Sequence, residues 1–440
     1  MRFIIKHTGV GSERIGHLTG FMKMPNTIIE TPTAALFTQG GSVVNITAEV
    51  LAKVFTTPQL LWVPVSNSLQ LENGLRAQNE GVAKFAGLSE HFTCVTLHSM
   101  SDPTVPGHFE QDRIPVWTKN GKKLLTAEGY MEVMEIYKPD LFMVIADGHT
   151  SLNDGKKRIS KSVERSYKTL TRCVDRYKAS NSLNNSSMIG VIVGAGDTAQ
   201  CCKFIEKLLA YKESLCGVTL QGITDGSDEG FSVPVENLDS IFKDIGALIP
   251  NNLLKIIEGC WNPVVVLAAI ERGWDLFDGS YPLKLTNAGV ALRLNLDIAT
   301  SDDTPYFLNL YDAKYKEDFS PILAGCECLA CKKHTRAYIR HLLNTREMLA
   351  GVLLSIHNLH HYDQFFQHAR RHIAAKTFSV YKEHITKQCN AHTLVIPIPK
   401  EKPLKPVEVV QKNKKKRQII CIFLFDNCLS NCPSALVISS

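Results

Sequence analysis

Long apolar runs are missing from this 440-residue sequence: nowhere do about 18 consecutive apolar residues mark a membrane-spanning helix. The first residues, MRFIIKHTGVGSER, also lack the apolar segment of a secretory signal peptide. The composition is also unbiased: hydrophobic residues make up 44% and charged residues 21%, as in ordinary globular proteins. This composition excludes a fibrous or largely disordered chain. We therefore expect a folded, intracellular protein.

Charge of one sign is only slightly in excess. The net charge of +6 favours, weakly, an encounter with a polyanion such as RNA. Cysteine, by contrast, is plentiful, with 13 residues in a sequence that shows no export signal. Because thiols stay reduced inside the cell, these cysteines indicate metal ligation more than disulfides.

Short β-branched runs alternate with amphipathic helical patterns from residue 141 onward. The runs expected to be buried parallel strands span 141–147, 188–194, 217–223, 253–259 and 274–280. Helical patterns lie between them at 159–177, 198–212, 235–247 and 262–272, and the last opens with Asn262 as N-cap before Pro263. Earlier candidate strands at 33–38, 59–66 and 92–98 bring the count to eight. This pattern predicts an α/β fold, a (β/α)₈ barrel, with an open doubly wound sheet as the alternative.

The domain organisation follows from changes in this pattern. Residues 1–287 are expected to form the barrel, with an inserted hairpin near 115–126 that turns at Asn120-Gly121. Residues 288–385 are expected to form a zinc-binding subdomain with closing helices, the helical region running from about 334 to 383. Residues 386–440 are expected to be a proline-rich linker and a tail that carries the basic run Lys412 to Arg417.

Three cysteines lie within six residues in the string CECLAC, namely Cys326, Cys328 and Cys331. A helical pattern carries His357, 26 residues after the third cysteine, at the edge of an apolar face. Three thiolates and one imidazole form a tetrahedral zinc site with no open position for water, which is typical of a structural ion. Other histidines nearby are alternatives for the fourth ligand: His334, His341, His360 and His361.

The segment CECLACKKHTRAYIRHLLNTREMLAGVLLSIHNLHHY resembles the zinc subdomain of the tRNA-guanine transglycosylases, whose signature is C-x-C-x-x-C followed by histidine about 25 residues later. The resemblance extends more faintly over about residues 1–385, through ADGHT, SVERSYKTLTRC and ERGWDLFDGSYPLK. It implies a (β/α)₈ barrel with a zinc insertion. It also implies exchange of the wobble guanine of tRNA for a deazaguanine base, queuine in eukaryotes, by one nucleophilic aspartate and one proton-transferring aspartate.

The resemblance places Asp278 at the position of the nucleophile, at the carboxyl end of a barrel strand. The second aspartate is absent from its expected segment, FTCVTLHSMSDPTV, where Leu97 or His98 stands instead and Asp102 lies out of register. The pocket that reads the base is reduced to Asp147-Gly148-His149. The expected glutamine-bearing strand end reads Val193-Gly194-Ala195-Gly196, which fits no phosphate-loop spacing either.

The arginines that read the uridines beside the wobble base are also replaced, by the segment Pro282-Leu283-Lys284-Leu285-Thr286-Asn287. A lysine is a point charge and cannot reproduce the planar guanidinium fork. A retained zinc motif beside eroded catalytic motifs is similar to the non-catalytic subunit found among eukaryotic family members. The resemblance therefore implies a subunit that carries no confident catalytic residue and forms a heterodimer with a catalytic homologue.

The resemblance further implies tRNA as a partner, one structural Zn²⁺ per subunit and a cytoplasmic protein with peripheral contact at the mitochondrial outer membrane. Basic residues around the zinc motif are candidate contacts to tRNA phosphates: Lys332, Lys333, Arg336 and Arg340, with Arg346, Arg370 and Arg371. Two alternatives stay open. One is an active transglycosylase that uses Asp278 with His98 or Asp102 as base, and the other is a zinc-stabilised scaffold protein.

Overall fold

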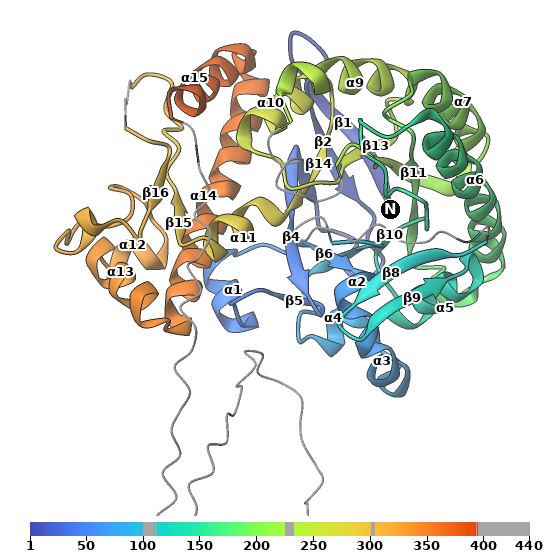
Figure 1. Cartoon of the computed structure of the whole chain (residues 1–440), viewed down its shortest axis with the longest axis horizontal. Coiled ribbons are helices and arrows are strands. Elements are labelled where there is room, and N and C mark those ends of the chain that lie inside the picture. Colours follow the sequence, from blue (N-terminus) through green and yellow to red (C-terminus); the bar gives the residue numbers. More distant parts are fainter. Residues whose placement is uncertain (100–109, 111, 225–232, 301–303, 393, 395–440) are drawn as a thin grey trace, which may run out of the picture. The chain divides into compact units, whose positions relative to one another are not determined.

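A closed barrel of eight parallel strands forms the larger part of the chain (Figure 1). The computed structural model describes residues 1–99, 110, 112–224, 233–300, 304–392 and 394. In order around the barrel, the strands are β4 (Thr33–Gln39), β6 (Leu60–Pro64), β7 (Phe92–Thr96), β10 (Leu141–Met143), β11 (Ser187–Ile192), β12 (Leu215–Leu220), β13 (Leu254–Ile257) and β14 (Leu276–Gly279). Parallel pairing of β14 with β4 closes the ring, which confirms the predicted barrel and rejects the open sheet.

Helices follow the strands and cover the outside of the barrel (Figure 1). They are α1 (Ala48–Val54), α2 (Val65–Ser68), α3 (Glu72–Gln78), α4 (Val82–Phe85), α5 (Ala127–Tyr137), α6 (Lys156–Ala179), α7 (Thr198–Leu209), α9 (Val235–Leu248), α10 (Pro263–Glu271) and α11 (Ser280–Asn287). The start of α10 shows the predicted cap, because the Asn262 side chain accepts hydrogen bonds from the amides of Val264 and Val265 and Pro263 occupies the first turn.

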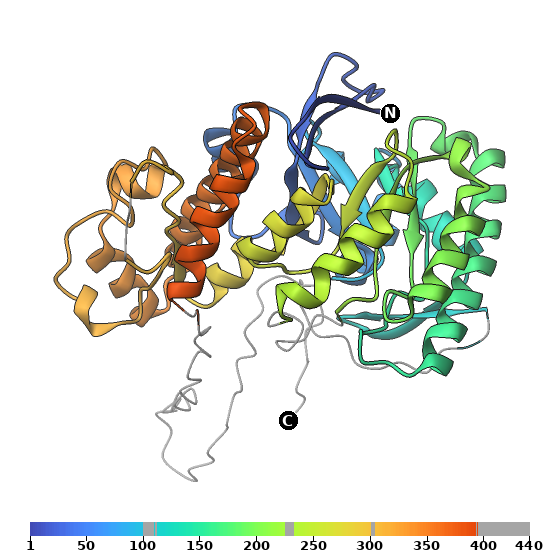
Figure 2. The same ribbon diagram turned by 90° about the horizontal axis from the view of Figure 1, so that it is seen from above.

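A three-stranded antiparallel sheet lies at the amino ends of the barrel strands, and its strands are β1 (Arg2–Thr8), β2 (Arg14–Thr19) and β3 (Ile29–Thr31) (Figure 2). Arg14 joins it to the barrel. Its guanidinium donates two hydrogen bonds to Asp275, just before β14, at 2.9 and 2.5 Å, and others to the carbonyl oxygens of Asn251 and Leu253. Because Arg14 and Asp275 are both buried, this bidentate pair fixes the sheet across the closed end.

An antiparallel hairpin is formed by β8 (Ile114–Thr118) and β9 (Gly121–Leu125), and Asn120-Gly121 lies at its turn. A further short strand, β5 (Ser42–Val43), extends β4. Among the described residues, no helix combines the length and the apolar character needed to cross a membrane.

The region after the barrel contains the hairpin of β15 (Val290–Leu292) and β16 (Phe307–Asn309), followed by α12 (Leu329–Lys333), α13 (Arg336–Thr345), α14 (Met348–Ala374) and α15 (Phe378–Ala391). The helical region expected from about 334 to 383 consists of α13, α14 and the first turns of α15. The helices are interrupted at Arg346 and at Lys376, which adopt left-handed φ values of 60° and 59°.

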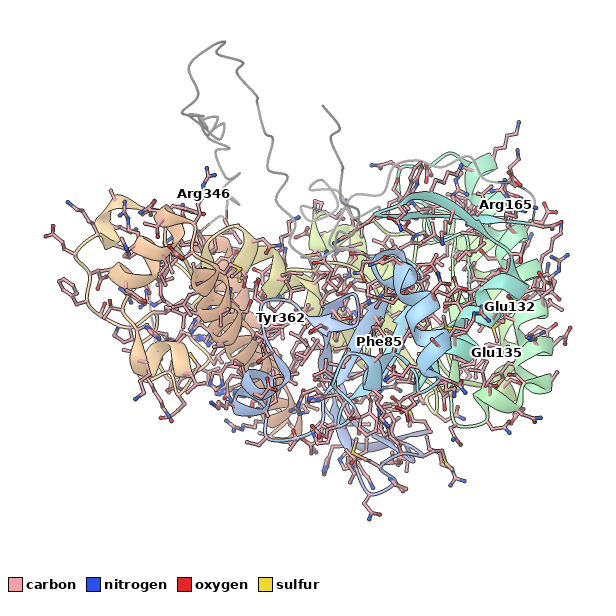
Figure 3. The ribbon with its side chains drawn as sticks, turned by 90° about the horizontal axis from the view of Figure 1, so that it is seen from below. Phe85, Glu132, Glu135, Arg165, Arg346 and Tyr362 are labelled. Carbon is pink, nitrogen blue, oxygen red and sulfur yellow. The ribbon has the colours of Figure 1, made fainter. Side chains whose placement is uncertain are left out.

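The long helix α14 lies between the zinc-motif region and the barrel. It packs on α11 and β4. Tyr362, labelled in Figure 3, lies at this junction, and its ring is tilted by 39° against that of Tyr281 with ring centres 5.8 Å apart. Helix α15 runs to Ala391, beyond the expected start of the linker at 386, because Ile385 and Gln388 are buried and Gln388 hydrogen-bonds Asn295. Apart from Leu394, the tail after residue 392, with Lys412 to Arg417, lies outside the described residues.

Candidate metal centre and barrel site

The three cysteines of CECLAC lie on one tight turn. Gly325, just before Cys326, has φ +76°, a conformation that favours glycine. Cys328 is the N-cap of α12, and its sulfur accepts a hydrogen bond from the Cys331 amide at 3.4 Å. This turn brings the three thiols to one side of the loop.

His357 meets these thiols from the middle of α14. Its Nδ1 lies 3.8, 3.6 and 3.3 Å from the sulfurs of Cys326, Cys328 and Cys331, and the four ligand atoms all lie within 4.8 Å of one another. Zinc bonds of about 2.3 Å to sulfur and about 2.1 Å to nitrogen place a sulfur and a nitrogen about 3.6 Å apart in a tetrahedron. The four side chains therefore have the donor set and spacing to hold a metal ion.

The other ring nitrogen of His357 fixes the orientation of the imidazole. Nε2 donates to the carbonyl oxygen of Leu292 in β15 at 2.7 Å, which leaves Nδ1 free to face the thiols. The next residue, Asn358, accepts from the Leu292 amide at 2.8 Å and donates to Val290. Two consecutive residues of α14 thus attach β15 to the helix and aim the histidine.

The other candidate histidines do not belong to the four-residue group in the part of the chain that is described. His334 stacks on Tyr338, and His361 stacks on His357 with ring centres 5.8 Å apart. Within the group, burial opposes protonation of His357, but contacts with the Cys326 and Cys328 thiols raise its pKa to about 9. Hydrogen bonds from Cys328 and Cys331 lower the pKa of Cys326. The same hydrogen bonds raise the pKa of Cys331, so protons are shared within the group, and a bound metal ion would displace them from its thiol and imidazole ligands.

Asp278 lies in β14 at the carboxyl end of the barrel, where the resemblance placed the nucleophile. It is buried, and its Oδ1 accepts a hydrogen bond from the Ser280 amide at 2.8 Å. Burial raises the pKa of Asp278 to about 7, against the lowering effect of Ser280. The raised pKa favours the protonated form of this carboxyl, which is the weaker nucleophile.

A second buried carboxyl, Glu258, follows β13 beside Asp278. Thr96 donates to its Oε2 at 2.7 Å, and the side-chain amide of Gln221 donates to its Oε1. Burial raises the pKa of Glu258 to about 7 although these hydrogen bonds lower it, and the charge of Asp278 raises it further. Glu258 is thus held inside the barrel by hydrogen bonds from side chains at the ends of two other strands.

His98, which with Leu97 is a candidate for the position of the family's second aspartate, is buried. Neither of its ring nitrogens has a hydrogen-bond partner among the described residues, and its ring meets that of His149 edge to face at 4.4 Å. Burial, with His149, holds the pKa of His98 well below its usual range. A histidine in this environment stays neutral and accepts protons poorly. Leu97 is buried beside it, and Asp102 lies outside the described residues.

Asp147, the remaining residue of the base pocket, is bound by two arginines of α6. Arg158 contacts both of its carboxylate oxygens, at 2.8 and 2.6 Å, and Arg165 contacts Oδ2 at 2.8 Å. Asp147 is fully buried, and Arg158 also donates to the carbonyl oxygen of His149. A purine edge would need both carboxylate oxygens and would have to displace a bidentate guanidinium.

Glycines in this region permit close packing of neighbouring side chains. A Cβ added to Gly148 would meet the Gln221 side chain at 2.0 Å, and one added to Gly194 would meet Val163 of α6 at 3.0 Å. Gly194 also has φ +90°. Helix α6 therefore packs closely against the turn at 193–196. Lys284 lies half-buried in α11, so the arginine pair of the family is replaced by one cation there.

Several of the expected tRNA contacts are engaged within the zinc-motif region. Arg336 donates to Asp318 and to the carbonyl oxygen of Ile322, both at 3.0 Å, and Arg340 donates to the carbonyl oxygen of Asp312 at 2.9 Å. Lys332 pairs with Glu327 at 2.6 Å, and Lys333 is exposed. The two arginines hold the loop before the cysteines, and RNA binding by this group stays a prediction.

Sequence reasoning missed Glu258, Gln221, Arg158 and Arg165. Glu258 had a usable signal, since a carboxylate directly after the apolar run LLKII marks the end of a strand. Arg158 and Arg165 are seven residues apart and therefore share one helix face, but only the fold shows that this face meets Asp147.

Comparisons with known proteins agree with this geometry. The sequence profile of queuine tRNA-ribosyltransferase matches residues 11–391. The chain is 34% identical over 394 residues to queuine tRNA-ribosyltransferase accessory subunit 2 of Culex quinquefasciatus, covering 88% of this chain and 91% of that protein. It is 30% identical over 410 residues to the accessory subunit 2 of Homo sapiens, covering 86% and 97%. The chain belongs to the queuine tRNA-ribosyltransferase family.

Proposed function

We propose that this chain is the non-catalytic subunit of a queuine tRNA-ribosyltransferase and acts by pairing with a catalytic homologue that exchanges the wobble guanine of tRNA for queuine. The names of its relatives, accessory subunit 2, support the assignment. The observation that carries it is the state of Asp147, whose two oxygens are bound by Arg158 and Arg165 and so are not free for a base.

The two reacting positions support the same conclusion. The segment expected to carry the family's second aspartate has Leu97 and the buried His98 instead, and the pKa of His98 is lowered by burial, while Asp278 is a desolvated carboxyl with a pKa of about 7. Base exchange needs an ionised nucleophile and a group that moves protons on the bases. In this barrel the raised pKa of Asp278 disfavours the ionised nucleophile and the second aspartate is missing, which supports the proposal that the partner performs the chemistry.

The ion expected at Cys326, Cys328, Cys331 and His357 is zinc in a structural role. Three thiolates and one imidazole fill a tetrahedron, and borderline-soft Zn²⁺ accepts that set without redox change. The carbonyl of Leu292 behind His357 supports this role, since it ties the site to the backbone of β15.

The surface for the catalytic partner is proposed to include the zinc-motif region. Large apolar side chains are exposed in it: Phe319 at 75%, Met348 at 87% and Tyr338 at 40%. A partner protein would cover such side chains. Lys332 and Lys333 border this region and are proposed to contact tRNA phosphates once the heterodimer forms.

The decisive experiment follows labelled guanine release from tRNA with the lone chain, with the catalytic homologue, and with both. We expect exchange only when the homologue is present. The matched variant is Asp278→Asn, which should leave exchange by the heterodimer unchanged, whereas loss of the nucleophile in the homologue should abolish it. Turnover by the lone chain that disappears in Asp278→Asn would establish an active enzyme instead, and failure to associate with the homologue would favour a scaffold.

A further inference from the structure

A basic hollow lies at the amino end of the barrel, opposite the mouth that holds Asp278. Its volume is about 530 Å³, and its charged and titratable lining comes from β1, β2, β3 and the last turns of α14. These residues are Lys6, His7, His17, Glu30, Arg370 and Arg371. Figure 2 shows α14 beside the first strands, and contacts of α14 with β1 and β2 agree with that view.

One carboxylate faces three permanent cations in this hollow. Glu30 lies 3.4 Å from Arg370 and 3.8 Å from His17, so its charge is already shared. Arg370 is only 15% exposed and also donates to the carbonyl oxygen of Pro32 at 2.8 Å, which fixes its guanidinium as part of the wall. The positive charge is therefore built into the fold at this point.

Two of the cations have no acidic partner within the described part of the chain. Neither Lys6 nor Arg371 forms an ion pair there, and Arg371 contacts the His368 ring at 3.4 Å. Lys6 and His7 both oppose protonation of His17, whose pKa burial already lowers. Cations that repel one another across a concave surface are relieved by a bound anion.

This hollow differs from the basic group around the zinc motif. There, Arg336 and Lys332 are neutralised by Asp318 and Glu327. Arg370 and Arg371, which sequence proximity placed with that group, lie about 20 Å further along α14 from His357, at 1.5 Å per residue. The two basic regions are therefore separate, and the hollow holds two cations that form no ion pair with the described residues.

We propose that the basic hollow binds backbone phosphate of RNA, as a contact separate from the barrel mouth, and this rests on the proposed role of the chain in a tRNA-modifying heterodimer. The lining side chains are donors suited to phosphate oxygens: an ammonium, two guanidiniums and two imidazoles. The hollow opens to solvent, so a polymer can place one or two phosphates in it. Such a contact positions the RNA and reads no sequence.

The test uses the full-length chain in complex with its catalytic homologue and measures the affinity for labelled tRNA over a range of salt concentrations. Lys6→Ala with Arg371→Ala should weaken binding on the order of tenfold at low salt and make the slope of log K against log salt shallower by about 1.4 to 1.8, the share of two phosphate contacts. The charge-matched control is Lys178→Ala with Lys243→Ala, two exposed lysines outside the hollow, which should change the slope by much less.

An unchanged salt slope in the hollow variant, or an equal change in the control, would overturn the proposal. So would a variant that loses binding to anionic phospholipid vesicles while its tRNA affinity is intact, because the anion would then be a lipid headgroup. Titration of wild type with inorganic phosphate should weaken tRNA binding more than chloride does at equal ionic strength. Base exchange by each complex is followed in parallel. If the complexes exchange the base but the hollow variant binds tRNA like wild type, only this inference is rejected. If no complex exchanges the base, the proposed function is rejected.

Discussion

Two buried aspartates at the mouth of the barrel have opposite surroundings. Asp147 is bound by two guanidiniums, whereas Asp278 accepts a hydrogen bond from the neutral Ser280 amide in a desolvated position. The same residue type is therefore a structural anion at one position and a partly protonated acid at the other. These surroundings, more than the presence of a carboxyl, decide what each residue can do.

The raised pKa of Asp278 makes a prediction about stability and pH. Its pKa rises from 3.8 to about 7 on folding, so burial of the charged form costs stability that grows as pH rises from about 4 through 7. Asp278→Asn removes this cost and should raise the free energy of unfolding at pH 8 by up to about 4 kcal/mol, with little change at pH 4. Denaturant unfolding at several pH values measures it.

The control for that experiment is Asp239→Asn. Asp239 pairs with Arg272 at 2.7 Å, and this hydrogen bond lowers the pKa of Asp239. Its contribution to stability is present at neutral pH and lost in acid, so the substitution should destabilise the chain above pH 4. Equal pH profiles for the two variants would contradict the assigned surroundings.

Asp147→Asn tests whether Asp147 is structural. The substitution leaves Arg158 and Arg165, 24% and 17% exposed, without a full counter-charge, and should cost about 3 kcal/mol of stability. Base exchange by the heterodimer should be unaffected as long as the variant is folded. Glu132→Gln, at an exposed position of α5 labelled in Figure 3, is the control and should change stability by less than about 0.5 kcal/mol. If the variant loses base exchange but keeps its stability, Asp147 takes part in binding the base.

At the scale of elements, α14 connects the parts of the molecule that matter for function. It carries His357 toward the cysteines, Tyr362 against the barrel, and Arg370 and Arg371 at the basic hollow. Its helical character was predictable from sequence. Its separation from α13 was not, because the break at Arg346 uses a non-glycine residue in the left-handed region, which propensity does not favour.

Asn358→Ala should loosen the attachment of β15 to α14. The side chain satisfies the Leu292 amide and donates to Val290 and Thr286, all buried, so its loss should cost on the order of 3 kcal/mol. Because Leu292 also orients His357, the variant should lose metal to a chelator faster than wild type. Asn181→Ala, in a short turn outside this contact, serves as control, and equal metal loss in both would reject the coupling.

At the scale of the whole molecule, a closed barrel and a metal-bearing region share one core through α14. Removal of the metal should therefore act locally. We expect chelation, or Cys328→Ser, to abolish stoichiometric zinc and to raise hydrogen exchange in α12 and α13 most, while the barrel strands remain protected. Elemental analysis with exchange mass spectrometry measures both. Cys202→Ser, at a half-buried cysteine of α7, should change neither, and unchanged zinc in Cys328→Ser would reject the site.

The sequence by itself determined the features that depend on local spacing. Alternation of apolar runs with helical patterns predicted the eight strands of the barrel. The spacing of three cysteines and His357 predicted the metal group. Both signals are periodicities or spacings that can be read along the sequence. Only the tertiary structure decided which distant side chains come together: that Arg158 and Arg165 bind Asp147, that Gln221 and Thr96 bind Glu258, and that Lys6 and Arg371 line one hollow. Such contacts depend on the closure of the barrel and on the packing of α14 against β1 and β2, which no single segment encodes.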